Sequence, residues 1–198
     1  MQPFRKIDAV AAPMRDADID TDQILPARFM FKRRQNYGEY CFYDMRIDEK
    51  SGHERADFIL NMPYYKNAKI IVCGPNFGCG SAREQAVHAL KDYGVMAFIG
   101  TNFGDIFYSN CLKNGLLPIV LNRKVVLSLF EIIENSPGVK ILIDLNKNYI
   151  RLPDGKKLDF SINKFYQMIL THGLDEIDYT LSLSECIDAY ESRNKIRK

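Results

Sequence analysis

Short apolar runs alternate with segments of helical spacing through the middle of the chain. Runs rich in β-branched and other apolar residues predict strands at 5–12, 69–73, 95–99 and 116–121. Apolar residues at helical spacing predict helices at 82–90 and 105–113, which Gly94 and Gly115 are placed to end. Strands that alternate with helices predict an α/β domain whose sheet is at least partly parallel.

The pattern changes after residue 121. An amphipathic helix is predicted at 125–134, followed by short strands at 140–145, 149–152 and 157–160. Two more helices are expected at 162–172, where Gly173 is placed as a C-cap, and at 182–193. The sequence contains no repeat, low-complexity segment or domain linker, so residues 1–198 are expected to form a single domain.

The segment 26–45 is aromatic and basic and has neither a helical nor a strand period. We expect a long, partly ordered connection, of the kind that is functional or mobile in compact domains. Its apolar side chains are expected to be exposed and to make the free chain self-associate. These side chains are Phe29, Met30, Phe31, Phe42 and Tyr43.

Composition and charge then exclude several classes of protein. The hydrophobic content of 46% is that of a globular protein, and the 27 basic and 25 acidic side chains nearly cancel. A nucleic-acid partner is therefore not expected, because such proteins carry a strongly basic face. No stretch approaches the roughly 20 apolar residues of a membrane helix, and the N-terminus is a weak secretory signal, so we expect a cytoplasmic protein without a membrane partner.

The cysteines do not form a recognisable site. All five are widely spaced and include no C-x-x-C pair, which indicates neither a disulfide framework nor a self-contained zinc or iron-sulfur site. A metal needed for function would have to come largely from elsewhere.

Candidate chemistry concentrates in the glycine-rich turn between the second predicted strand and the first helix. From Gly74 to Glu84 the spacing is G-x-x-x-G-x-G-S-x-R-E, which matches neither nucleotide-binding glycine pattern and lacks their lysine. Gly78 and Gly80 would let backbone amides approach an anion at the helix start. Ser81 and Arg83 place a hydroxyl beside a guanidinium that can bind a carboxylate, so an organic acid is the expected ligand.

Other interpretations stay open, two for the glycine-rich turn and one for the acidic run at 15–22. Cys79 is a candidate low-pKa nucleophile at a helix N-terminus, although His88 lies well down the helix. Ser81 and Glu84 fit an S-x-x-E capping box with a purely structural role. Asp20 and Asp22, in the acidic run 15–22, fit a solvated Asx turn.

Three longer motifs occur in order along the chain. They are DIDTDQILPARF at 18–29, GPNFGCGSAREQAVHALKDYG at 74–94 and TNFGDIFYSNCLKNGLLPI at 101–119, and HGLDEIDYTL at 172–181 follows them. Together they resemble the small subunits of 3-isopropylmalate dehydratase, in the aconitase superfamily, over nearly the whole chain.

The resemblance implies a fold and a partner. The expected fold is a three-layer β/β/α swivelling domain with a mixed sheet, which docks on a large subunit that holds a 4Fe-4S cluster. This chain would bind no cofactor itself. The implied reaction dehydrates a 2-hydroxy diacid to a cis-unsaturated acid and rehydrates it at the neighbouring carbon, in leucine biosynthesis.

The resemblance also assigns roles to residues. Ser81 stands at the position of the base that takes the substrate proton, and Asp22 matches an active-site aspartate near it. Thr21 would shape the loop of Asp22. Arg83 would bind one substrate carboxylate, and Arg34 or Arg33 the second. Asn110, Lys113 and Asn114 are expected to be mainly architectural.

The chain departs from the commonest family pattern at two positions of the glycine-rich turn. Ala82 stands where a second serine is usual, and Gln85 stands where histidine is usual. A hydratase of another diacid, such as citraconate or methylmalate, dimethylmaleate or homoaconitate, is therefore the alternative. A non-catalytic anion-binding module is the second alternative.

Overall fold

The computed structural model describes residues 1–31, 34–81 and 83–194. Within them the chain forms one seven-stranded sheet in the order β4-β3-β2-β1-β5-β6-β7. The strands are β1 (Lys6–Met14), β2 (Ile70–Cys73), β3 (Ala97–Gly100), β4 (Leu117–Val120), β5 (Lys140–Asp144), β6 (Tyr149–Arg151) and β7 (Lys157–Asp159). All seven lie where the apolar runs predict them.

The long strand β1 joins a parallel half of the sheet to an antiparallel half. Its residues 6–10 pair with β5 in antiparallel register, and its residues 11–14 pair with β2 in parallel register. β3 and β4 continue the parallel half, whereas β6 and β7 continue the antiparallel half as a meander. The expected α/β fold with a mixed sheet is therefore confirmed.

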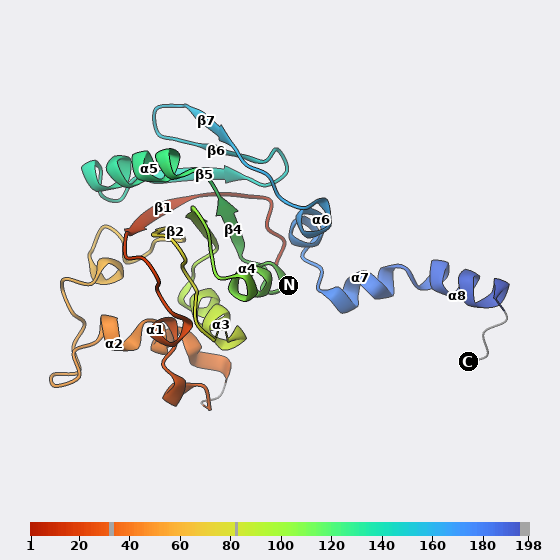
Figure 1. The fold of residues 1–198 in the computed structure, drawn as a ribbon, viewed down its shortest axis with the longest axis horizontal. Coiled ribbons are helices and arrows are strands. Elements are labelled where there is room, and N and C mark those ends of the chain that lie inside the picture. The colour runs from red at the N-terminus through yellow and green to blue at the C-terminus, as the bar shows by residue number, and fades with distance from the viewer. Residues whose placement is uncertain (32–33, 82, 195–198) are drawn as a thin grey trace.

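Helices cover the parallel half of the sheet. The longer helices of the body on this half are α3 (Glu84–Tyr93), α4 (Asp105–Asn114) and α5 (Arg123–Asn135), whereas Gln167 of α6 (Lys164–His172) donates a hydrogen bond to the carbonyl oxygen of Leu145, just after β5. Figure 1 shows α3 and α4 on the side of β1 opposite to β5, β6 and β7, and α5 contacts β1, β2 and β3. The carboxyl ends of the parallel strands open toward the loops that precede α1 (Thr21–Ile24), α3, α4 and α5.

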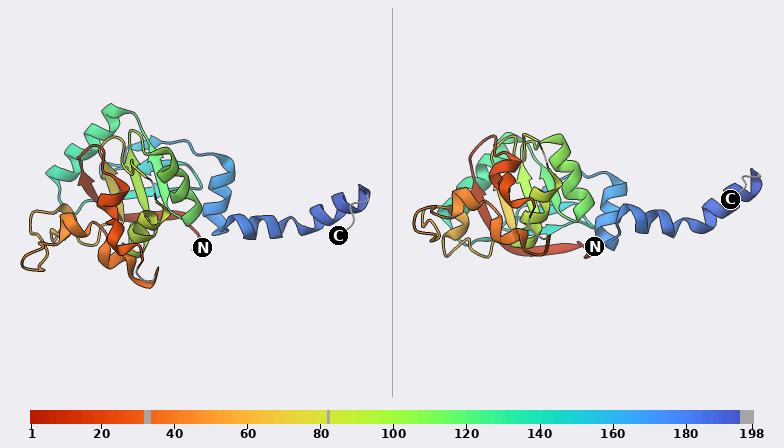
Figure 2. Two further views of the ribbon diagram at one scale, coloured as in Figure 1. Left: turned by 60° about the horizontal axis from the view of Figure 1, so that its bottom comes forward. Right: turned by 90° about the horizontal axis from the view of Figure 1, so that it is seen from below.

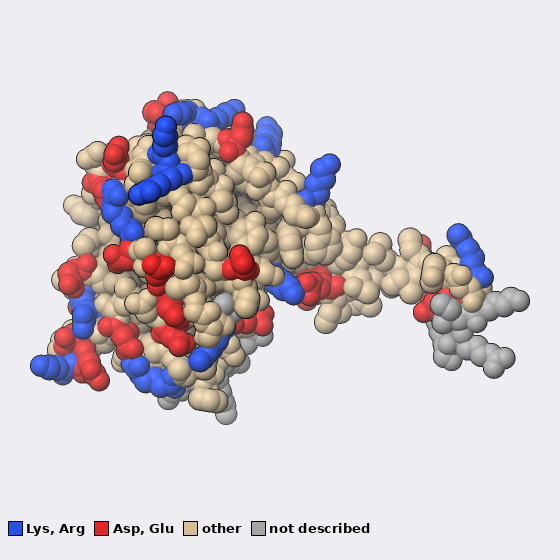
Figure 3. All heavy atoms as spheres, in the orientation of Figure 1, with Lys and Arg blue, Asp and Glu red and all other residues tan. Residues whose placement is uncertain are grey.

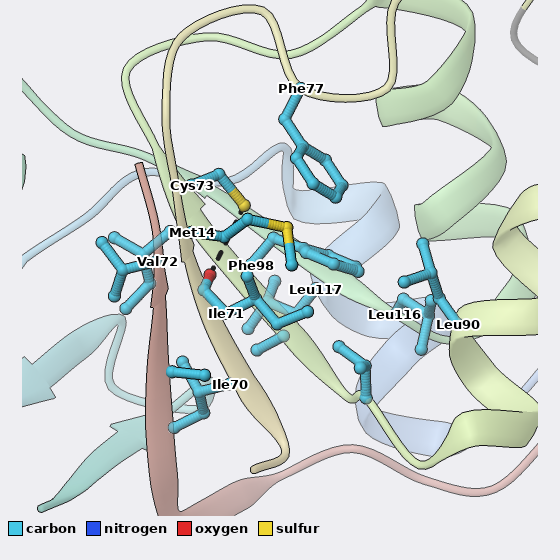
Figure 4. Packing of buried hydrophobic residues seen from close by; sticks show 14 of the residues in the cluster. Met14, Ile70, Ile71, Val72, Cys73, Phe77, Leu90, Phe98, Leu116 and Leu117 are labelled. Atoms are coloured by element: carbon cyan, nitrogen blue, oxygen red, sulfur yellow. Dashed lines mark hydrogen bonds between the residues drawn. The ribbon is translucent and has the colours of Figure 1, made fainter. Parts of the chain in front are cut away.

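The core lies between the parallel strands and these helices. Phe77, Phe98 and Phe107 are fully buried, and their ring centroids are 5.5 to 5.6 Å apart. Figure 4 shows Phe77 and Phe98 near Met14 of β1 and Leu117 of β4. Truncation of such a buried aromatic ring costs about 3–5 kcal/mol, so this cluster fixes the turn that contains Phe77 to the sheet.

The expectation for residues 26–45 was wrong in part, because short helices follow one another there. They are the 3-10 helices η1 (Ala27–Phe29) and η2 (Arg34–Tyr40) and the helix α2 (Tyr43–Arg46); α1 (Thr21–Ile24) precedes them and η3 (Ile59–Asn61) follows. Phe29 stacks on Tyr40 with ring centroids 4.4 Å apart, and Phe42 is fully buried. Arg46 donates hydrogen bonds to the carbonyl oxygens of Cys41 and Glu39. Of the five apolar side chains expected to be exposed, only Phe31 is.

The predicted C-terminal helix is confirmed, but the helix that precedes it was missed. The helix expected at 182–193 is α8 (Ser184–Arg193), and α7 (Glu176–Ser182), which was not predicted, precedes it. Neither has a buried residue, and Figures 1 and 2 show them projecting from the body as an arm. The arm exposes Ile177, Leu181 and Tyr190, each to more than 60%. Five of the eleven exposed large apolar side chains in the described residues thus belong to the arm.

The surface charges are mixed in sign. Figure 3 shows Lys and Arg interspersed with Asp and Glu over the visible face of the body. Within residues 1–31, 34–81 and 83–194, no helix is long and apolar enough to cross a membrane.

Candidate active site

The glycine-rich turn leaves β2 at Cys73 and enters α3 at Glu84. Gly78 and Gly80 have φ of +76° and +80°, the left-handed region that glycine adopts without a steric cost. A Cβ atom on Gly78 would lie 2.2 Å from Cγ of Phe107, and one on Gly80 would lie 2.1 Å from Oδ2 of Asp20. Both positions require glycine for conformation and for space.

The segment that precedes α1 lies alongside this turn. Asp20 and Cys79 form a parallel β-bridge, in which the Thr21 N–H donates to the Cys79 carbonyl at 3.1 Å. The Gly78 N–H donates to the Ile19 carbonyl at 2.8 Å and is therefore already used within the chain. This pairing brings together the two polar segments that the sequence separates widely.

Asp22 and Arg83 meet across the two segments. Nη1 of Arg83 lies 3.5 Å from Oδ1 of Asp22, and the two side chains are 35% and 49% exposed. Nη1 of Arg83 also donates to the Met30 sulfur at 3.0 Å. Ser81 is exposed and lies in the same turn as Arg83. A hydroxyl, a carboxylate and a guanidinium thus share one rim of the molecule.

Thr21 lies beneath this rim. It is 1% exposed, and its hydroxyl is 3.4 Å from Oδ1 of Asp20. The predicted site residues Ser81, Asp22, Arg83, Thr21, Gly78 and Gly80 therefore belong to one place in the fold. Arg33 lies outside the described residues. The backbone of Arg34 begins η2, but its side chain lies outside the described part of the chain.

The capping-box interpretation of Ser81 and Glu84 is wrong. The N-cap of α3 is Arg83, which makes no side-chain cap hydrogen bond, so Ser81 lies before the helix. Glu84 instead accepts a hydrogen bond from Nδ2 of Asn114 at 2.9 Å. The hydroxyl of Ser81 therefore has no capping role.

Asn114 links the beginning of α3 to the end of α4. Besides Glu84, it contacts Nε2 of His88 through Oδ1 at 2.9 Å, and its carbonyl accepts from Nζ of Lys91 at 2.8 Å. The architectural role expected for Asn114 is confirmed. This network holds α3, which begins directly after Arg83, against the end of α4.

The interpretation of Asp20 and Asp22 as a solvated Asx turn is correct for Asp20, whose side chain accepts a local backbone N–H. It is incomplete for Asp22, whose side chain pairs with Arg83. Oδ1 of Asp20 accepts the Asp22 N–H at 2.7 Å, and the Asp20 N–H donates to Oε1 of Gln23 at 2.8 Å. This reciprocal capping box begins α1. The D-x-x-Q spacing at 20–23 was the available sequence signal for it. No comparable signal pointed to the contact of Met30 with Arg83.

Cys79 lacks the properties of a nucleophilic thiol. Burial, followed by the charges of Asp20 and Asp18, raises the pKa of the Cys79 thiol above its ordinary value. A reactive thiol needs the opposite shift. In the described part of the chain, no group of three or more His, Cys, Asp or Glu side chains could hold a metal ion.

Comparison with known proteins is consistent with this geometry. Residues 1–124 match the protein family described as the aconitase C-terminal domain, so the fold and the site define a domain of that class. The 3-isopropylmalate dehydratase small subunit of Methylobacterium radiotolerans is 45% identical over 194 residues, covering 98% of this chain and 96% of the relative. That of Rhodopseudomonas palustris (strain BisB18) is 44% identical over 199 residues, covering 100% and 98%. The chain belongs to the family of 3-isopropylmalate dehydratase small subunits.

A solved structure extends the likeness to three dimensions. The crystal structure of 3-isopropylmalate dehydratase from Methanocaldococcus jannaschii has a TM-score of 0.66 and 30% sequence identity. The match covers 94% of this chain and 99% of that one. The expected swivelling-domain fold is confirmed.

Proposed function

We propose that this chain is the small subunit of an isomerase that interconverts 2-isopropylmalate and 3-isopropylmalate in leucine biosynthesis. The observation that carries the proposal is the pairing of Asp22 with Arg83 at 3.5 Å. Ser81 lies in the same turn as Arg83, and its hydroxyl does not cap α3. The chain belongs to the family of 3-isopropylmalate dehydratase small subunits. Residues 1–198 would act as one swivelling domain that brings these groups to a cluster-bearing large subunit.

The reaction sets what this chain must supply. Loss of a carbon-bound proton and of the hydroxyl group on the neighbouring carbon yields isopropylmaleate and water. Readdition of water with the opposite orientation yields the isomer. The chain must therefore bind a dicarboxylate and must hold a base at the proton-bearing carbon.

Ser81 is the proposed base. An ordinary serine hydroxyl is a weak base, so its alkoxide needs stabilisation by nearby dipoles and positive charge. The Gly80 amide, the N-terminal amides of α3 and the guanidinium of Arg83 are the nearby groups that can supply it. Gly78 contributes the shape of the turn, since its own N–H is bonded to Ile19.

The arginines are the proposed carboxylate ligands. Arg83 can bind one carboxylate of the diacid in a bidentate pair, and Asp22 would keep the guanidinium aimed until substrate arrives. Arg34, with Arg33 beside it, is proposed for the second carboxylate. Thr21, buried under the rim, would fix the loop that presents Asp22.

The large subunit is needed because the rim is open. Ser81 and Asp22 are exposed in this chain, whereas abstraction of a carbon-bound proton is favoured in a site closed to bulk solvent. Cys41, Cys73 and Cys111 are buried and are not available to an iron-sulfur cluster. We assign the 4Fe-4S cluster to the large subunit, where it would supply the Lewis acid for the hydroxyl group.

The test is reconstitution. The purified chain, mixed with a cluster-loaded large subunit, is expected to hydrate isopropylmaleate, and Ser81→Ala is expected to lower kcat by about 10²- to 10⁴-fold with subunit assembly unchanged. Failure of the wild-type mixture to hydrate isopropylmaleate would exclude the proposal. A kcat/KM higher for citraconate or dimethylmaleate than for isopropylmaleate would favour the alternative, a hydratase of another diacid. Ala82 and Gln85, which depart from the family pattern, suggest this alternative. Full turnover by the Ser81→Ala complex would favour a non-catalytic role.

A further inference from the structure

Asp20 occupies a central position in the candidate site and is partly exposed. Its backbone pairs with Cys79, and its carboxylate caps α1 through the Asp22 N–H at 2.7 Å. The same carboxylate fills the space beside Gly80 that a Cβ atom would occupy. One side chain thus contacts both the helix that presents Asp22 and the turn that presents Ser81.

We propose that Asp20 is a positioning residue, whose carboxylate holds the first turn of α1 against the Ser81 turn and thereby keeps Asp22 paired with Arg83. The inference deepens the proposed function and rests on it. It assigns to Asp20 no contact with substrate.

The local geometry explains why a side chain is needed at this point. α1 has only four residues, and a helix of that length is not stable by itself. Its first turn is held by the capping box, by the Thr21 N–H to the Cys79 carbonyl, and by the 3.0 Å bond from the Gln23 N–H to the Asp20 carbonyl. Without the carboxylate, the Asp22 amide loses its acceptor, and the carboxylate of Asp22 loses its fixed distance from Arg83.

The carboxylate also rests on the turn itself. The atoms closest to a Cβ built on Gly80 are Oδ2, Cγ and Oδ1 of Asp20, at 2.1 to 2.6 Å. The charge of Asp20 is one of the causes, after burial, that raise the pKa of the neighbouring Cys79 thiol. Loss of this side chain would leave a space next to the residue that precedes Ser81.

Two substitutions separate the cap from the charge. Asp20→Asn keeps an oxygen acceptor of the same reach, whereas Asp20→Ala removes it. If the carboxylate positions the site, Asp20→Ala lowers kcat of the reconstituted complex about 10- to 100-fold, since a displacement near 1 Å can cost this much. Asp20→Asn is expected to retain kcat within about 3-fold, because its amide oxygen still accepts the Asp22 N–H. KM is expected to change less than kcat in both variants.

A matched control is available in the arm. Asp175 caps α7 in the same way, with the Asp178 N–H donating to its Oδ1 at 2.7 Å and its own N–H donating to Asp178 at 3.1 Å. Asp175→Ala removes an equivalent cap away from the candidate site and is expected to leave kcat within about 2-fold. A loss of kcat equal to that of Asp20→Ala would show that loss of any helix cap impairs the complex, and would overturn the proposal.

Hydrogen exchange in the free chain gives a readout that needs no activity. The Asp22 amide is expected to exchange at least 10-fold faster in Asp20→Ala than in the wild type, and to stay protected in Asp20→Asn. If the wild-type complex is active and the Asp20→Ala complex has the same kcat, the inference is overturned. An inactive wild-type complex would instead contradict the proposed function, and unchanged exchange of the Asp22 amide in Asp20→Ala would still overturn the positioning role.

Discussion

A methyl group placed on Gly80 provides a direct test of the packing between the glycine-rich turn and Asp20. Alanine at this position must adopt φ near +80°, and its Cβ would lie 2.1 Å from Oδ2 of Asp20. The left-handed conformation costs an L-residue about 1 kcal/mol. Displacement of the carboxylate adds about 1–3 kcal/mol, from overpacking and from loss of the α1 cap. We therefore expect Gly80→Ala to lower the free energy of unfolding by about 2–4 kcal/mol.

Gly155 isolates the conformational part of this cost. It has φ of +86°, close to that of Gly80, and a Cβ on it would meet nothing within 4 Å. Gly155→Ala is therefore expected to cost about 1 kcal/mol, which corresponds to a Tm lower by about 2–4 °C in a chain of this size. Gly80→Ala is expected to lower Tm by about 4–16 °C.

The double variant identifies the colliding group. In an Asp20→Ala background the three atoms nearest to the new Cβ are absent, so Gly80→Ala should cost only about as much as Gly155→Ala. Thermal and urea unfolding of the four variants and the wild type measure this coupling. Equal losses for Gly80→Ala and Gly155→Ala, or additive losses in the double variant, would refute the collision with Asp20.

Three further outcomes are expected. Arg83→Lys is expected to raise KM for the diacid about 10-fold or more in the reconstituted complex, since lysine cannot form a bidentate carboxylate pair, and steady-state kinetics would contradict this if KM were unchanged. A hydrogen bond from Arg15, together with the positive charge of Arg15, lowers the pKa of Glu134. The pair therefore stabilises the fold at pH values above the ordinary carboxyl pKa, and this stabilisation is lost as the pH falls through the lowered pKa. With side chains 46% and 41% exposed, the effect is at most about 1 kcal/mol, and the Tm difference between wild type and Glu134→Gln should shrink between pH 7 and pH 3 rather than grow. Serine at both Ile177 and Leu181 is expected to leave Tm within about 2 °C, because both side chains are exposed, and to reduce any self-association seen by light scattering; a large fall in Tm would show that the arm packs on the body.

Much of the architecture followed from the hydrophobic pattern. Each predicted strand is present, and the glycines at 94, 115 and 173 end α3, α4 and α6 as left-handed C-caps. These features depend on residues close together in the chain, whose local preferences and burial agree. The chain between 26 and 45 was misjudged because its helices are short and are stabilised by tertiary contacts, such as the stacking of Phe29 on Tyr40.

The sequence by itself predicted which residues belong to the candidate site, because motifs in the segment before α1 and in the glycine-rich turn resemble one family. It could not show how these residues meet. The Asp22–Arg83 pair, the bridge of Asp20 to Cys79 and the fit of Gly80 against Asp20 join segments far apart in the chain. Tertiary structure decided these contacts, because the parallel pairing of β1 with β2 sets the two loops side by side at the carboxyl ends of their strands.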